Sequence, residues 1–201
     1  MTGPQGSGNH LFSKALATNS AIFGWTNLLN VYWEGHDQEP FADYWMNPTT
    51  LSEFDWDTSD VFVTSISCPF FYKGVECVPN YDAFITEAKK YCTVKVLIIG
   101  RDSNILEFQQ ERIRGRHTAP DFVEQVGSLL KYDHMFISQE LLYLYRMSYL
   151  NSIEDYLAIP RTTDNTQLED ILKENANRKY IESVTRHWLD AEVYKAVNNN
   201  S

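Results

Sequence analysis

The stretch Met1–Ala17 reads MTGPQGSGNHLFSKALA, a glycine-rich turn that runs directly into a helix predicted from Asn9 to about Ala17. Glycines at positions 3, 6 and 8 let consecutive backbone N–H groups point to a common centre, where the helix dipole adds positive potential. We therefore predict that residues 3–10, the glycine-rich loop, bind a phosphate-type anion. The alternative is a glycine-rich helix start with no ligand, although three glycines in six residues are unusual there.

Working outward from this loop, short apolar runs predict buried strands at residues 60–67, 94–99 and 134–138. Helices are predicted at residues 81–91, 104–114, 119–131, 140–157, 167–176 and 181–197. Strands that alternate with helices indicate an α/β fold with a parallel central sheet covered on both faces, in one domain spanning residues 1–201. Only Met1 and Thr2 precede the loop, so the first strand is expected to be truncated. Residues 20–58 are aromatic and irregular and are interpreted as an insertion or lid, whose rings either pack or line an acceptor pocket. Because ligands bind beyond the carboxyl ends of parallel strands, the turns 3–10, 68–74, 100–104 and 139–140 are expected to carry the chemistry.

The loop has the G-x-x-x-x-G spacing of a Walker A motif but lacks the Lys-Ser/Thr pair that completes it. Asn9 and His10 stand in those two positions, and neither replaces a phosphate-binding lysine or a magnesium-binding hydroxyl. The loop is therefore expected to bind its anion without a metal.

Composition excludes several function classes. The net charge of −10 argues against a nucleic-acid partner, and no apolar run approaches the roughly 18 residues that a membrane span needs. An odd number of cysteines, three, without a C-x-x-C pair favours a reduced, cytoplasmic setting. Against the acidic background, four arginines gather in one segment, which suggests either a local anion site or a solvated helix face: Arg101, Arg112, Arg114 and Arg116.

Five blocks, in this order, resemble the motifs of the sulfotransferase family: GPQGSGNH at 3–10, TSISCP at 64–69, VLIIGRDS at 96–103, SQELL at 138–142 and IEDYLAIP at 153–160. The resemblance implies a three-layer P-loop fold and a 3′-phosphoadenylyl sulfate donor. It implies that the 5′-phosphosulfate binds the loop, formed by Gly3, Pro4, Gln5, Gly6, Ser7, Gly8, Asn9 and His10. Lys14 is expected to compensate for the family's missing loop cation.

The same resemblance assigns the donor's 3′-phosphate to Arg101, with Gln109 in the place of a family serine. Ser67 stands where the family has a histidine general base, so the base must come from elsewhere. His36 is the first choice, and His10 and Glu34 are the alternatives, because an unperturbed imidazole titrates near pH 6.5.

The sequence thus predicts a sulfotransferase acting on a hydroxyl or amine of a small-molecule or glycan acceptor. Two alternatives stay open: a nucleoside or nucleotide kinase-like P-loop enzyme, and a non-catalytic nucleotide-binding relative.

Overall fold

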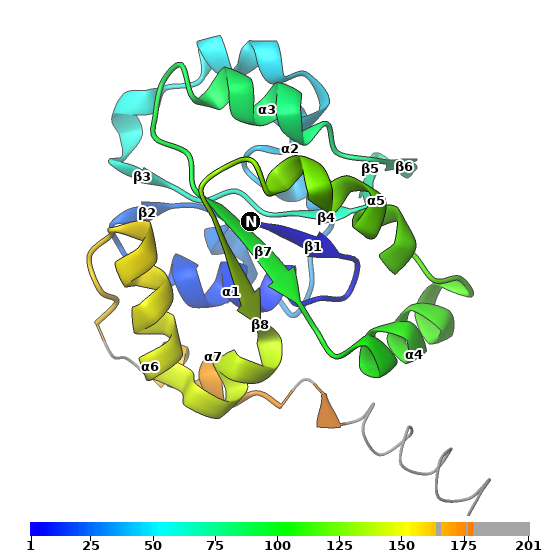
Figure 1. Ribbon diagram of the computed structural model, residues 1–201. Helices are drawn as coiled ribbons and strands as arrows, with labels where there is room; N and C mark the ends of the chain where they lie inside the picture. The colour runs from blue at the N-terminus through cyan, green and yellow to red at the C-terminus, as the bar shows by residue number, and fades with distance from the viewer. Residues whose placement is uncertain (164–165, 176, 179–201) are drawn as a thin grey trace, which may run out of the picture.

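The computed structural model describes residues 1–163, 166–175 and 177–178 (Figure 1). Four parallel strands form its main sheet in the order β4-β1-β7-β8, which confirms the predicted α/β class with a parallel sheet. Two smaller pairs accompany this sheet: parallel β2 with β3, and antiparallel β5 with β6. The strands are β1 (Thr2–Pro4), β2 (Ile22–Phe23), β3 (Val61–Phe62), β4 (Ile66–Cys68), β5 (Phe70–Tyr72), β6 (Val75–Cys77), β7 (Val96–Gly100) and β8 (His134–Ser138).

The first strand is short, as expected, yet it lies in the interior of the sheet between β4 and β7. The strand predicted at 60–67 is divided into β3 and β4. The N–H of Val63 donates to the Phe23 carbonyl, whereas the N–H of Ile66 donates to the Met1 carbonyl. Along an extended chain, neighbouring N–H groups point to opposite sides, so those of Val63 and Ile66, three residues apart, point to opposite edges. β2 therefore lies on the edge of residues 61–68 that faces away from β1.

Helices cover both faces of the sheet (Figure 1). Along β7 the side chains alternate: Val96 and Ile98 join the apolar core beneath α3 and α5, whereas Leu97 and Ile99 join the core formed with α1, α6 and α7. The helices are α1 (Asn9–Ala17), α2 (Ala42–Met46), α3 (Tyr81–Ala88), α4 (Ser103–Arg114), α5 (Ala119–Leu129), α6 (Gln139–Leu157) and α7 (Thr166–Lys173). The helix predicted at 181–197 lies outside the described residues.

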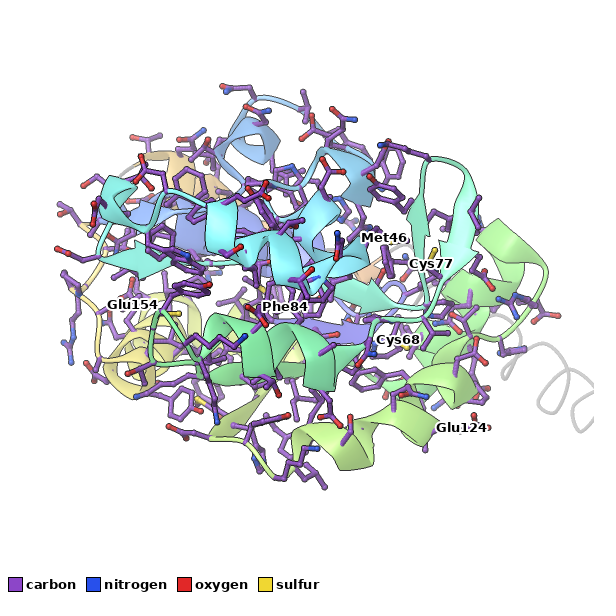
Figure 2. The ribbon with its side chains drawn as sticks, turned by 90° about the horizontal axis from the view of Figure 1, so that it is seen from above. Met46, Cys68, Cys77, Phe84, Glu124 and Glu154 are labelled. Atoms are coloured by element: carbon purple, nitrogen blue, oxygen red, sulfur yellow. The ribbon has the colours of Figure 1, made fainter. Side chains whose placement is uncertain are left out.

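The aromatic segment 20–58 contains β2, α2 and several 3₁₀ turns, and much of it belongs to the core. Phe41 and Trp45 are buried, and Trp45 stacks on Phe84 of α3 with ring centroids 3.7 Å apart. Figure 2 looks onto this side of the molecule, where α3 and the aromatic segment lie side by side. Tyr32 and Trp33 are different: 81% and 66% of their surfaces are exposed. The segment is therefore largely structural, with exposed rings at one place.

The sequence did not reveal the β5–β6 hairpin, which follows β4 and turns at Lys73-Gly74. Both turn residues have positive φ angles, 48° and 81°, as a two-residue hairpin turn requires. None of the helices in the described part of the chain is long and apolar enough to cross a bilayer.

Candidate functional site

The strand order creates a topological switch point between β1 and β7. The chain leaves β1 through α1 and returns at β4 on one side, whereas it leaves β7 through α4 and α5 and returns at β8 on the other. In open parallel sheets, ligands bind beyond the carboxyl ends of the strands at this point. Here β1 runs into the glycine-rich loop and β7 into Arg101, so both predicted anion-binding elements meet there.

The loop itself is a tight turn between β1 and α1. Gly3 and Pro4 belong to β1, and the N–H of Ser7 donates to the Pro4 carbonyl at 3.0 Å. Gly6 and Gly8 have φ angles of 85° and 118°, which side-chain-bearing residues rarely adopt. Gly8 is the N-cap of α1 and has no side chain, so no side-chain cap accepts a hydrogen bond from the first backbone N–H groups of the helix. The helix start can therefore bind an anion.

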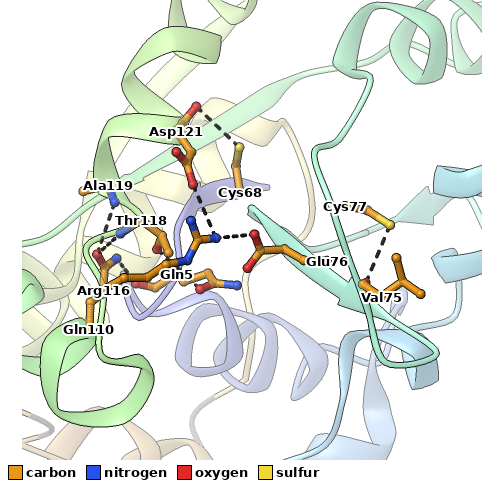
Figure 3. Close-up of polar contacts among 10 residues, drawn as sticks. All are labelled: Gln5, Cys68, Val75, Glu76, Cys77, Gln110, Arg116, Thr118, Ala119 and Asp121. Atoms are coloured by element: carbon orange, nitrogen blue, oxygen red, sulfur yellow. Dashed lines mark hydrogen bonds and ion pairs between the residues drawn. The ribbon is translucent and has the colours of Figure 1, made fainter.

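Side chains from α4 position this loop (Figure 3). The amide nitrogen of the fully buried Gln110 donates to the Gln5 carbonyl at 2.6 Å, and its oxygen accepts the N–H groups of Thr118 and Ala119. One glutamine thus links the loop to the beginning of α5.

Three buried polar atoms around the loop have no hydrogen-bond partner among the described residues: Ser7 Oγ, Asn9 Oδ1 and Gln139 Oε1. Each of these residues is at most 5% exposed. A Cβ built on Gly8 would lie 3.0 Å from Gln139 Oε1, so the loop and α6 approach closely. Asn9 and Gln139 line the cavity and their unpartnered oxygens can only accept, so they suit a ligand group that donates hydrogen bonds, whereas Ser7 Oγ lies beside Gly3, outside the cavity wall.

Arg101 and Gln109 lie together beside the loop, as predicted. The Arg101 guanidinium donates to the Gly6 carbonyl at 2.5 Å, to Gln109 Oε1, and through Nε to Asn177 Oδ1 at 3.1 Å. A Cβ on Gly6 would come within 3.0 Å of the Gln109 side chain. The predicted 3′-phosphate residues therefore adjoin the predicted 5′-phosphosulfate loop.

The structure brings His36 to the position that the sequence left without a base. His36 Nε2 lies 3.5 Å from Ser67 Oγ at the end of the strand β4, and the ring centroids of His36 and His10 are 5.4 Å apart. Buried Glu39 fixes this geometry, because its carboxylate accepts the N–H groups of both Phe41 and Ser65.

His10 has a defined tautomer. Its Nε2 lies 2.8 Å from the Glu34 carbonyl oxygen, which can only accept, so the neutral ring carries its proton on Nε2 and leaves Nδ1 as an acceptor. Burial lowers the pKa of His10, which favours this neutral form. The Glu34 carboxylate accepts the Trp25 indole N–H at 2.6 Å and orients that ring. Glu34 therefore has a structural contact, whereas His10 and His36 face the cavity.

A cavity of about 500 Å³ joins these groups. Nine predicted site residues line it: Gln5, Gly6, Gly8, Asn9, His10, Lys14, His36, Arg101 and Gln109. Gly3, Pro4 and Ser7 are buried and do not form its wall. Five further lining residues fall in segments that the sequence had indicated: Tyr32 and Trp33 in the aromatic segment, Phe71 and Lys73 in the turn 68–74, and Gln139 in the turn 139–140. The sequence did not single out Asp37 or Ile113 for this site. The Lys73-Gly74 pair between apolar residues was a readable turn signal.

Arg112 and Arg116 do not line the cavity. Arg116 pairs with Glu76 and lies 3.9 Å from Asp121 (Figure 3). Arg112 is exposed on α4 and is not part of the cavity wall, and the Arg114 side chain lies outside the described part of the structure. Of the two alternatives for the arginine segment, the exposed Arg112 therefore fits a solvated helix face, and Arg101 lies at the cavity.

Comparison with known proteins gives no match: no family model, no curated protein and no solved structure is similar to this chain. Within the residues that the structure describes, no group of three or more His, Cys, Asp or Glu side chains could hold a metal ion. The geometry of the site is therefore the basis of the proposed function.

Proposed function

We propose that this chain is a cytoplasmic P-loop transferase of three-layer architecture, which moves a sulfuryl group from 3′-phosphoadenylyl sulfate to a hydroxyl or amine acceptor. One observation carries the proposal. The glycine-rich loop, the Arg101–Gln109 pair and the imidazole of His36 line one cavity at the switch point of a parallel sheet. The loop was predicted from its glycines, Arg101 and Gln109 from the resemblance to sulfotransferases, and His36 as the replacement base. Together they would supply the anion, nucleotide and proton contacts.

The donor's two anionic ends fit the two adjoining parts of the site. The loop amides and the start of α1 would bind the 5′-phosphosulfate. Arg101 and Gln109 would bind the 3′-phosphate with charge-assisted and neutral hydrogen bonds. To do so, the Arg101 guanidinium keeps its contact with the Gly6 carbonyl or exchanges it for the phosphate.

The reaction needs one proton acceptor. The acceptor oxygen or nitrogen attacks sulfur, the bond between sulfur and the phosphate oxygen breaks, and adenosine 3′,5′-bisphosphate leaves. His36 takes the acceptor proton, and Ser67 orients its imidazole from 3.5 Å away. The unprotonated Nδ1 of His10 is the second group suited to this role.

The acceptor would lie against exposed rings at the mouth of the cavity. Tyr32, Trp33 and Phe71 are 81%, 66% and 46% exposed, and all three line the same cavity. Clustered exposed apolar side chains mark binding surfaces. Flat rings or sugar faces in a small-molecule or glycan acceptor would stack on them.

Calorimetric titration with adenosine 3′,5′-bisphosphate, adenosine 5′-phosphate and ATP, each with and without Mg²⁺, tests the proposal. We expect the bisphosphate to bind most tightly and independently of Mg²⁺. Tighter binding of ATP with Mg²⁺ would replace the proposal with a kinase-like activity. Bisphosphate binding without sulfuryl transfer to any phenol, sugar or amine in a panel would indicate a non-catalytic relative.

A further inference from the structure

The β5–β6 hairpin (residues 70–77) reaches the donor site from outside the predicted motifs. It begins two residues after Cys68 and folds back with Tyr72 paired to Val75, so that Lys73 and Gly74 form its two-residue tip. Phe71, Lys73 and Gly74 line the cavity that contains the glycine-rich loop. The tip therefore faces the place where the loop would bind an anion.

Two contacts hold this hairpin in place. Glu76 on β6 pairs with Arg116, which follows α4 and also lies 3.9 Å from Asp121 on α5 (Figure 3). On the other side, the Tyr72 hydroxyl donates to the Asp43 carboxylate of α2. The hairpin is thus attached to α2 through Tyr72 and to the segment after α4 through Glu76.

The loop lacks a cationic side chain, and two lysines line the cavity: Lys14 and Lys73. The Lys14 ammonium donates to the Tyr32 carbonyl at 3.2 Å, and six residues of helix place Lys14 about 9 Å along α1 from Gly8. Lys73 lies 3.9 Å from Asp43, with side chains 70% and 78% exposed, and exposed pairs of this kind are weak. Lys73 can therefore leave Asp43 for a stronger anion.

We propose that Lys73 provides the cationic contact to the anion in the glycine-rich loop, so that the hairpin tip completes the donor site. This inference rests on the proposed function only for the identity of the donor. In physical terms, the ammonium of Lys73, which belongs to a separate hairpin, contacts the anion that the loop amides bind. The stem of a lysine is long and flexible, which suits a contact that forms only when the anion binds.

The test is calorimetric titration of the full chain with pyrophosphate and with adenosine 3′,5′-bisphosphate. Lys73→Met is compared with Lys14→Met and with the control Lys90→Met, which removes an exposed lysine paired with Glu87 outside the cavity. We expect Lys73→Met to weaken both ligands about tenfold, with Lys14→Met and Lys90→Met changing them less than about twofold. The loss should shrink as salt is raised.

A double-mutant cycle with Glu76→Gln adds a readout specific to the hairpin. If Glu76 positions Lys73, then Glu76→Gln weakens pyrophosphate binding in the wild-type chain but has no effect in Lys73→Met. Unchanged binding by Lys73→Met, or a larger loss in Lys14→Met, overturns the inference and leaves the sulfotransferase proposal standing. Pyrophosphate binding that depends on Lys73, without preference for the bisphosphate over ATP, supports the inference and refutes the sulfotransferase proposal. A wild-type chain that binds neither ligand refutes both.

Discussion

Gly8 offers a direct test of the glycine-rich loop, because its φ of 118° is unfavourable for any residue with a side chain. In Gly8→Ala, the new Cβ would also lie 3.0 Å from Gln139 Oε1, which must shift. Strain of this kind is worth about 2 kcal/mol. For a domain of this size that corresponds to a Tm lowered by about 4–8 °C. Movement of the loop amides should also weaken adenosine 3′,5′-bisphosphate about 10- to 100-fold, the worth of one charge-assisted hydrogen bond.

Gly115→Ala is the matched control. Gly115 ends α4 with a φ of 67°, and a Cβ there would meet nothing within 4 Å. It should lower Tm by about 2–4 °C, for about 1 kcal/mol of left-handed strain, and leave bisphosphate affinity unchanged. Thermal unfolding and calorimetric titration of both variants separate strain from ligand contact. If Gly8→Ala binds the bisphosphate as tightly as Gly115→Ala, the loop does not hold the donor and the reasoning is refuted.

Three further predictions concern single side chains. Arg101→Ala should weaken adenosine 3′,5′-bisphosphate by about 10- to 100-fold more than adenosine 5′-phosphate, as measured by titration; equal weakening of both would remove the 3′-phosphate assignment. His36→Ala should lower the rate of sulfuryl transfer by about 10²- to 10⁴-fold while bisphosphate affinity stays constant, and an unchanged rate would exclude His36 as the base. Burial raises the pKa of Glu39 to about 7 from 4.5, so the fold loses stability as pH rises from about 4.5, where the unfolded carboxyl ionises, to about 7, where the folded one does, by about 3 kcal/mol in all. The Tm of Glu39→Gln should therefore rise relative to wild type between pH 5 and pH 8, and a pH-independent difference would contradict the assigned pKa.

The parts of the fold that the sequence predicted are those with a strong local signal. The strand at His134–Ser138 and the start of α5 at Ala119 were predicted at their observed positions, because apolar runs and a proline near a helix start are local features. The glycines of the loop were equally readable, since positive φ at Gly6 and Gly8 is a backbone requirement that selects glycine.

The parts that the sequence missed depend on contacts between distant segments. β2, β5 and β6 contain two or three residues each, too few for any periodicity to show. The aromatic segment showed many rings but not which of them are buried, and that depends on partners such as Phe84, about 40 residues further along the chain from Trp45. Lys73 lies in the turn 68–74 that was expected at the ligand edge of the sheet, but the hairpin that carries it was not predicted, because its contact between Glu76 and Arg116 joins distant segments.

The position of His36 depends on a contact between segments that are distant in the sequence, which a comparison of short motifs does not detect. At the end of β4 the chain has Ser67, a poor base, and the imidazole beside it comes from a residue 31 positions earlier. The link between the two segments is Glu39, which accepts the N–H groups of Phe41 and Ser65 and so ties the turn after His36 to the segment that leads into β4. A proton acceptor works through the position of its nitrogen, whatever its place in the sequence. Ser67 therefore does not by itself exclude the proposed transfer, because the imidazole of His36 lies 3.5 Å from its hydroxyl.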